Sequence, residues 1–139
     1  MVNNTRRRMR GFTLIELLVV LAILTLLAGI VGPKVLGQLD KSKVKTAAIQ
    51  IDELDKSLEL FKLDVGRYPS TEEGLNALVT NPGSAVGWNG PYPKGGIPSD
   101  PWNNPYHYSN NGGTIEILSL GADGAPGGEG ENADIRNKP

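Results

Sequence analysis

Residues 12–32 read FTLIELLVVLAILTLLAGIVG, an apolar run that contains one charged side chain, Glu16. As an α-helix the run would be about 32 Å long, close to the roughly 30 Å hydrocarbon core of a bilayer. It is too long for the apolar region of an ordinary signal peptide, and Pro33 follows Gly32 where a small-residue cleavage site would stand. The run therefore predicts a membrane-spanning helix, although hydropathy alone leaves a plain signal anchor open.

The charge of the chain is distributed unevenly about this run. The 139 residues include 14 basic and 15 acidic side chains, a net charge of −1, but four arginines precede Phe12 (Arg6, Arg7, Arg8 and Arg10). Without residues 1–11 the net charge is −5, because ten basic side chains remain against 15 acidic ones. The cationic end favours retention on the cytoplasmic side of a membrane, and the acidic remainder argues against a nucleic-acid partner. The absence of cysteine excludes a disulfide framework and a thiolate metal site.

Glu16 is the residue of the apolar run that needs an explanation. A carboxylate in a lipid-facing helix costs roughly 2.5–3.5 kcal/mol at the bilayer centre on insertion scales. One interpretation is an ion pair with Arg10 at the membrane surface. The other is that the chain is cut after Gly11, so that Phe12 gains a free α-amine one helical turn from Glu16. The carboxylate could then neutralise the amine of its own chain or that of a neighbouring copy.

The stretch RGFTLIELLVV at residues 10–20 resembles the precursor signature of type IV pilins and pseudopilins. In that family a basic leader ends in glycine, phenylalanine usually follows, and a glutamate stands at the fifth mature position, as Gly11, Phe12 and Glu16 do here. The resemblance implies that a membrane prepilin peptidase removes residues 1–11 by cutting between Gly11 and Phe12, and that it N-methylates Phe12. It also implies that Phe12 and Glu16 act in assembly.

The residues after the apolar run continue a helical pattern. The transmembrane and assembly helix is expected over 12–33, and Pro33, close to three glycines, predicts a kink or local melting. Over 34–65 an amphipathic continuation is indicated by apolar residues at three- and four-residue steps, namely Val44, Ala47, Ala48, Ile51, Leu54, Leu58, Phe61 and Val65. We therefore expect one helix over 12–65, about 80 Å long, whose apolar stripe packs on a C-terminal domain.

The first part of that domain reads as turns and a short helix. Ser70 and Glu73 form a capping-box pattern, which predicts a short second helix that ends before Asn81. Residues 83–105 are rich in proline and glycine and predict a structured loop. We expect this loop to be held to the core by its larger aromatic side chains, Trp88, Tyr92 and Trp102.

The second part predicts an antiparallel hairpin. Side chains alternate over 106–108 and 114–120, and the sequence Asn-Asn-Gly-Gly joins the two stretches. His107, the only histidine, is expected to be a surface strand residue and not a catalytic base. The sequence contains no P-loop, nucleophile elbow or paired histidine ligands, so we expect no enzymatic activity.

Residues 66–78 (GRYPSTEEGLNAL) and 100–106 (DPWNNPY) resemble the G subunit, the major pseudopilin of type II secretion systems. The resemblance implies an α+β, type IV pilin-like fold, in which a long N-terminal helix packs on a periplasmic globular domain, residues 66–139. It also implies a single-pass protein of the bacterial inner membrane that polymerises into a periplasmic pseudopilus and drives export of folded exoproteins. The implied partners are further copies of the chain, minor pseudopilins, the prepilin peptidase, the inner-membrane assembly platform and the lipid bilayer.

Two other functions stay open at this point. A pilin for adhesion, motility or DNA uptake would share the N-terminal signature, although adhesive type IV pilins usually carry a C-terminal disulfide, which this chain cannot form. The other is a membrane-anchored, calcium-binding protein that never polymerises.

The glycine-rich segment near the C-terminus, residues 121–135, carries four carboxylates: Asp123, Glu129, Glu131 and Asp134. Ca²⁺ takes six to eight oxygen ligands in a flexible cage, which suits this composition, but the spacing is not that of an EF-hand, and composition alone favours a solvated acidic loop. The resemblance to the G subunit implies instead a structural Ca²⁺ held by Asp123, Asp134 and the backbone carbonyls of Leu120 and Arg136, with Ala125 as a further carbonyl donor. The chain departs from the family in a loop that is longer than in some relatives and in the absence of an aromatic residue after Asp-Ile.

Overall fold

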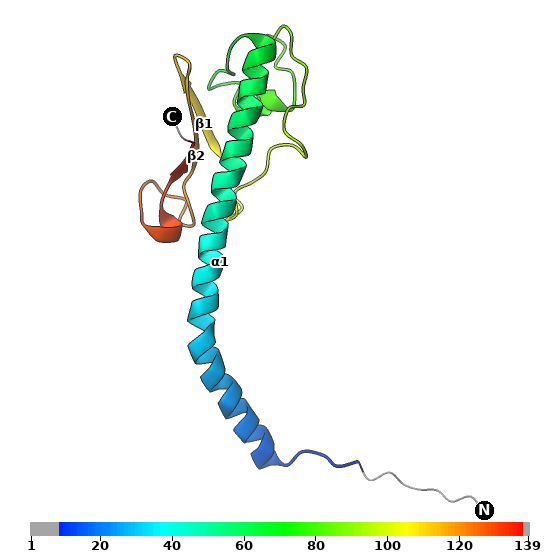
Figure 1. Ribbon diagram of the computed structural model, residues 1–139, viewed down its shortest axis with the longest axis vertical. Coiled ribbons are helices and arrows are strands. Elements are labelled where there is room, and N and C mark those ends of the chain that lie inside the picture. The colour runs from blue at the N-terminus through cyan, green and yellow to red at the C-terminus, as the bar shows by residue number, and fades with distance from the viewer. Residues whose placement is uncertain (1–8, 138–139) are drawn as a thin grey trace, which may run out of the picture. The chain divides into compact units, whose positions relative to one another are not determined.

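The structure is a computed structural model that describes residues 9–137 (Figure 1). Its elements follow in the order α1 (Leu14–Val65), the 3-10 helix η1 (Leu75–Leu78), β1 (His107–Asn111), β2 (Thr114–Ser119), the 3-10 helix η2 (Gly130–Asn132) and β3 (Ile135–Arg136). The predicted α+β class, with a long N-terminal helix and a short antiparallel sheet, is confirmed. The predicted leader lies mostly outside the described residues. Contacts divide the chain into two compact units, residues 1–38 and 39–139, which are described separately below.

The first unit contains the stalk, by which we mean residues 14–38 of α1. The helix begins at Leu14, two residues later than predicted, and it continues through Pro33. The prediction of local melting at Pro33 is therefore wrong, since the loss of one backbone donor does not interrupt the helical hydrogen bonds on either side. The kink stays a prediction.

The second unit has its core on one face of the outer part of α1. Buried residues recur at helical spacing along that face: Ala47, Ile51, Leu54, Ser57, Leu58 and Phe61. Leu75 and Leu78 of η1, Tyr106 and Ile117 complete the cluster from the rest of the unit. Five of the eight predicted stripe positions are buried and Val65 is partly buried against the same core, whereas Ala48 is exposed and was placed wrongly.

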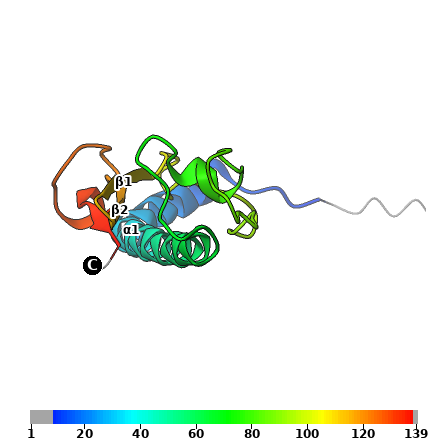
Figure 2. The same cartoon turned by 90° about the horizontal axis from the view of Figure 1, so that it is seen from above.

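A three-stranded antiparallel sheet, in the order β1-β2-β3, covers part of the buried face of α1. Viewed along α1 in Figure 2, the sheet and the loop that precedes it lie on the same side of the outer helix. The predicted hairpin is confirmed: Asn111 pairs with Thr114, and the turn residues Gly112 and Gly113 have φ of 63° and 96°, which glycine adopts without strain. β3, only two residues long, was not predicted. His107 is exposed on β1, as expected.

The capping box after α1 forms as predicted, but the helix that follows is different. Ser70 N–H donates to Glu73 Oε2 at 2.8 Å, and Glu73 N–H donates to Ser70 Oγ at 3.1 Å. Gly74 then adopts φ of 62°, which is incompatible with an α-helix, so the chain forms a turn and the 3-10 helix η1. The predicted second helix is therefore a short 3-10 helix over Leu75–Leu78.

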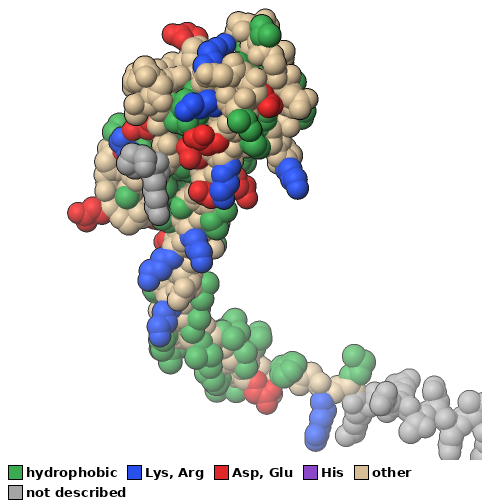
Figure 3. All heavy atoms as spheres, turned by 45° about the horizontal axis from the view of Figure 1, so that its top comes forward, with side chains coloured by type: hydrophobic (Ala, Val, Ile, Leu, Met, Phe, Trp, Pro, Cys, Tyr) green, Lys and Arg blue, Asp and Glu red, His purple; other side chains and the backbone are tan. Residues whose placement is uncertain are grey.

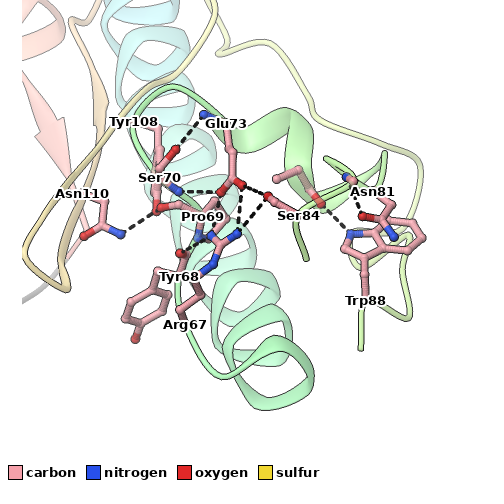
Figure 4. Close-up of polar contacts among 12 residues, drawn as sticks. Arg67, Tyr68, Pro69, Ser70, Glu73, Asn81, Ser84, Trp88, Tyr108 and Asn110 are labelled. Carbon is pink, nitrogen blue, oxygen red and sulfur yellow. Dashed lines mark hydrogen bonds and ion pairs between the residues drawn. The ribbon is translucent and has the colours of Figure 1, made fainter. Parts of the chain in front are cut away.

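Glu73 is also the centre of a polar network that joins the end of α1 to this turn (Figure 4). Arg67 forms a bidentate ion pair with Glu73, with Nη1 2.7 Å from Oε2 and Nη2 2.9 Å from Oε1. Ser84 Oγ donates to Glu73 Oε1 at 2.7 Å. The Arg67 guanidinium, together with the donors from Ser70 and Ser84, lowers the pKa of Glu73 from 4.5 to about 2, although partial desolvation opposes the shift.

The loop before the sheet is held by two of the three predicted aromatic anchors. Trp88 Nε1 donates to the carbonyl of Ala77 at 2.7 Å, and the rings of Tyr92 and Phe61 meet edge to face at 5.7 Å. Trp102 is half-buried, but it is not among the residues packed against the core cluster, so its predicted role is not seen.

Asp100, which sequence analysis did not single out, fixes the end of that loop. It is 4% exposed, and its carboxylate accepts hydrogen bonds from the N–H groups of Trp102 and Asn104 and from Ser119 Oγ at 2.8 Å. A buried carboxylate with three donors is satisfied, and it ties the loop to the end of β2.

Alanine variants of a buried and an exposed leucine on α1 measure how much the buried helix face contributes to the free energy of unfolding. Leu58 is 0% exposed and Leu60 is 51% exposed, so Leu58→Ala should lower the free energy of unfolding by about 2–5 kcal/mol and Leu60→Ala by less than about 1 kcal/mol. Denaturant unfolding of the full chain in detergent measures both. Equal losses would contradict the placement of the core.

The Glu73 network predicts a pH dependence of stability. Because the pKa of Glu73 is about 2 in the folded chain and near 4.5 when unfolded, its contribution is present above pH 4.5 and is lost as the pH falls toward 2. Glu73→Gln should therefore be less stable at neutral pH and lose less stability than wild type between pH 4.5 and 2. Unfolding curves at a series of pH values test this, with Glu72→Gln, an exposed neighbour, as the control. Parallel pH profiles for wild type and Glu73→Gln would show that the network is energetically silent.

Candidate functional site

The predicted processing site lies in an exposed, non-helical segment. Residues 9–13 precede the first turn of α1, and Phe12 is 89% exposed. No atom of another residue would crowd a side chain added at Gly11. The Gly11–Phe12 peptide bond is therefore accessible and outside the helix, which is compatible with cleavage there.

Glu16 takes part in a capping interaction that sequence analysis missed. The Thr13 N–H donates to Glu16 Oε2 at 3.2 Å, and the Glu16 N–H donates to Thr13 Oγ1 at 3.2 Å. The pair is a reciprocal capping box at the start of α1, and the pattern Thr-x-x-Glu could have been read from the sequence. In this structure the Glu16 carboxylate is thus bound to its own chain, and neither Arg10 nor the amide of Phe12 is its partner.

The stalk offers a continuous apolar surface next to this carboxylate. Its best 18-residue window has a mean hydropathy of 2.9 and no buried residue, so it is long and apolar enough to cross a membrane. In the view of Figure 3, hydrophobic side chains cover the visible side of the stalk. Near the helix start, a shallow groove of about 340 Å³ is lined by Glu16 together with Phe12, Ile15, Val19 and Val20.

The predicted calcium loop is folded back on itself. The Ala122 N–H donates to the carbonyl of Glu131 at 2.8 Å, which joins the two arms of the loop. Gly121 has φ of 71°, and a side chain there would meet the carbonyl oxygens of Glu131 and Ala133 at 2.7 and 2.8 Å. The close approach of the two arms therefore requires glycine at this position.

Within this loop, the carboxylate of Asp134 is the group best suited to bind a cation. Its side chain is 13% exposed, and its Oδ1 atom is buried with no hydrogen-bond partner among the described residues. Its Oδ2 atom lies 3.5 Å from Nη2 of Arg136, a long contact. A buried carboxylate oxygen without a partner is costly, so a ligand of positive charge fits at Oδ1.

The other predicted ligands are placed less distinctively. Asp123 is exposed, and its Oδ1 accepts the Ala125 N–H at 3.1 Å in a local turn. Residues 9–137 contain no group of three or more acidic, histidine or cysteine side chains that could hold a metal. A cation here would therefore depend on two aspartates and backbone oxygens, the donor set that the resemblance to the G subunit implies.

The backbone carbonyl of Arg136 is free of the sheet. The Asn137 N–H donates to the carbonyl of Ile117. Asn137 and Ile117 are therefore a hydrogen-bonded cross-strand pair. The adjacent pair, Arg136 with Leu118, is then the type whose carbonyls point away from the partner strand. Because β3 is at the edge of the sheet, the Arg136 carbonyl is available to a ligand, and Leu120 directly follows the end of β2.

Negative charges crowd one side of the same loop. The interaction of Glu131 with the nearby carboxylate of Asp40 on α1 raises the pKa of Glu131. Lys43 opposes the shift but does not cancel it. A bound cation would relieve this repulsion.

Comparison with known proteins covers both parts of the chain. Residues 34–138 match the family described as Type II secretion system (T2SS), protein G, and residues 6–32 match the prokaryotic N-terminal methylation motif. A type II secretion system core protein G of Vibrio cholerae is 45% identical over 137 residues, which cover 94% of this chain and 92% of that protein. Its counterpart in Pseudomonas aeruginosa is 44% identical over 137 residues, with coverages of 95% and 96%.

A solved structure agrees with these likenesses. The crystal structure of the major pseudopilin from the type 2 secretion system of enterohaemorrhagic Escherichia coli is 33% identical, with a TM-score of 0.61. The match covers 73% of this chain and 91% of that one. With the long helix, the hairpin and the glycine-rich loop all in place, the chain belongs to the type II secretion system protein G family.

Proposed function

We propose that this chain is the major structural subunit of a type II secretion pseudopilus. It is stored in the inner membrane through its stalk and polymerises into a periplasmic filament whose growth drives export of folded proteins. The observation that carries this proposal is the protein G match over residues 34–138, since the N-terminal motif alone is shared with other pilins. The fully exposed apolar stalk supports membrane storage, because no part of the described chain covers it.

The chemistry of assembly centres on Glu16. In the uncut chain its carboxylate accepts the Thr13 N–H, so one of the backbone donors at the helix start is satisfied. Cleavage after Gly11 by the prepilin peptidase, followed by N-methylation, would place a cationic amine on Phe12, close in sequence to this carboxylate. In a medium of low dielectric constant the two charges attract strongly, and the amine of one copy is available to Glu16 of the same chain or of the next.

The remaining partners follow from that role. The assembly platform and the minor pseudopilins would be needed to extract and nucleate the subunits, because a stalk with this hydropathy does not leave a bilayer unaided. The sequence contains no P-loop for nucleotide hydrolysis. The reaction that drives filament growth therefore belongs to other components.

Replacing Glu16 separates assembly from processing. In a strain that lacks its own copy of the gene, Glu16→Ala should be cut and stable but should form no filaments and restore no secretion, because the stalk loses the partner for the amine. Mass spectrometry of the mature N-terminus, electron microscopy of sheared filaments and an exoprotein assay measure the three properties. Thr13→Ala, which removes the hydrogen bond from the Glu16 N–H to Thr13 Oγ1 but keeps the carboxylate, is the matched control and should assemble. Normal filaments from Glu16→Ala would sink the charge-pairing mechanism.

We also propose a structural Ca²⁺ in the loop after β2. Asp123 and Asp134 would supply the side-chain ligands, and the carbonyls of Leu120, Arg136 and Ala125 would supply backbone oxygens. The support is the buried Oδ1 of Asp134, which has no hydrogen-bond partner within residues 9–137, and the carbonyl of Arg136, which points away from β2. Ca²⁺ suits this set better than Mg²⁺, since it accepts more oxygens in an irregular cage. When bound, the ion would neutralise the loop and hold its two arms together.

Removing calcium should therefore destabilise the protein. With free Ca²⁺ at about 100 times its Kd, binding contributes about 2.7 kcal/mol, so addition of EGTA should lower Tm by on the order of 10 °C. Asp123→Ala should abolish this sensitivity, whereas Glu129→Ala, an exposed acid of the same loop, should retain it. Thermal unfolding of the full chain in detergent measures the shift. If EGTA leaves the wild-type Tm unchanged, the calcium site is absent.

A further inference from the structure

Asn137 joins three parts of the globular unit through its side chain. Its Nδ2 donates to Asp55 Oδ1 of α1 at 3.2 Å and lies 3.4 Å from the carbonyl of Ile115. Its Oδ1 accepts the Ile117 N–H at 2.9 Å, and its own N–H donates to the carbonyl of Ile117 at 3.1 Å. One asparagine thus fastens the end of β3 both to β2 and to the helix.

The side chain of Asn137 takes the place of a backbone carbonyl in the sheet. In a hydrogen-bonded antiparallel pair, each residue donates its N–H and offers its carbonyl to the other. Here the Ile117 N–H is satisfied by the amide oxygen of the Asn137 side chain, so the ladder is completed without the main-chain carbonyl of Asn137. The amide nitrogen of the same group is then left to reach Asp55.

This contact matters because β3 is very short. The strand has two residues, Ile135 and Arg136, and a pairing of that length has little stability of its own. Arg136 adds an ion pair with Glu116 of β2, at 2.7 Å, but both side chains are about half exposed, so this pair contributes little. The half-buried amide of Asn137, together with the backbone bond from its N–H to Ile117, therefore holds this end of the strand.

The fastened strand carries the second half of the calcium site proposed above. Asp134 precedes β3 directly, and the free carbonyl of Arg136 belongs to it. Asp123 lies on the other arm, where the Gly121 N–H donates to Ser119 Oγ at the end of β2 and the Ala122 N–H donates to the carbonyl of Glu131 on the opposite arm. The distance between the two sets of ligands therefore depends on how firmly β3 is held.

We propose that Asn137 is a positioning residue for calcium: its amide holds β3 against β2 and α1 and thereby fixes Asp134 and Arg136 in the arrangement that binds the ion. This inference rests on the proposed calcium site. Groups that orient metal ligands from outside typically change affinity by about 10–100-fold when they are removed. Asn137→Ala should accordingly raise the Kd for Ca²⁺ by at least about tenfold, although no atom of its side chain is a ligand.

The test compares calcium affinity with stability in the full chain, purified in detergent. Titration calorimetry with CaCl₂ gives Kd, and thermal unfolding in CaCl₂ and in EGTA gives the calcium-dependent rise in Tm. In Asn137→Ala we expect a weaker Kd and a smaller rise than in wild type. Asn89→Ala, a change at an exposed asparagine of the preceding loop, is the control and should leave both values unchanged.

Exchanging the side chains of Asn137 and Asp55 tests whether calcium affinity can be restored. Asn137→Asp keeps an acceptor for the Ile117 N–H but places a carboxylate against Asp55, so it should weaken calcium binding as alanine does. The double variant Asn137→Asp/Asp55→Asn restores a donor opposite an acceptor and should recover most of the lost affinity. This pair also keeps the test decisive if Asn137→Ala does not fold.

The outcomes separate the two proposals. If wild type does not bind Ca²⁺, the calcium site and the role of Asn137 both fall. If wild type binds but Asn137→Ala and Asn137→Asp bind with unchanged Kd, only the positioning role is overturned. Equal losses of Tm with and without calcium would likewise show that Asn137 is merely structural.

Discussion

An apolar stripe on the outer part of α1 must be covered for that part of the helix to exist in water. Isolated helices are marginal, and most of their stability comes from packing an amphipathic face. Ile51, Leu54, Leu58 and Phe61 form that face, and residues 66–137 are folded over it as two short 3-10 helices, three short strands and the loops between them. The stalk has no such cover within the described chain, so its apolar surface is left to lipid or to other copies.

The elements that sequence analysis found are those with a local signal. The helix follows from its three- and four-residue spacing, and the hairpin follows from alternation on either side of Gly112 and Gly113. The predicted second helix is present as a 3-10 helix and not as an α-helix, because Gly74, between the capping box and the apolar residues, has a positive φ that no pattern in the sequence indicated. β3 was missed because two residues cannot show alternation.

The candidate sites divide in the same way. The predicted processing and assembly residues lie within a few positions of one another, so the motif at 10–20 predicts them without a structure. The calcium ligands came from resemblance, since composition alone favoured a solvated loop. The unpartnered Oδ1 of Asp134 and the amide of Asn137 depend on contacts across the fold, and the partner of Asn137 on α1 lies 82 residues away in the sequence. No short pattern reports such a contact.

The capping box of Thr13 and Glu16 has a consequence for the order of events at the N-terminus. An N-cap residue has non-helical backbone angles, so it fixes where extended chain changes to helix. Residues 9–13 lie outside the helix, which begins behind them, so a protease would reach the Gly11–Phe12 bond without having to unwind a turn. Glu16 would therefore serve twice in sequence, first as the boundary that presents the bond to be cut and then as the counter-charge for the amine that the cut creates.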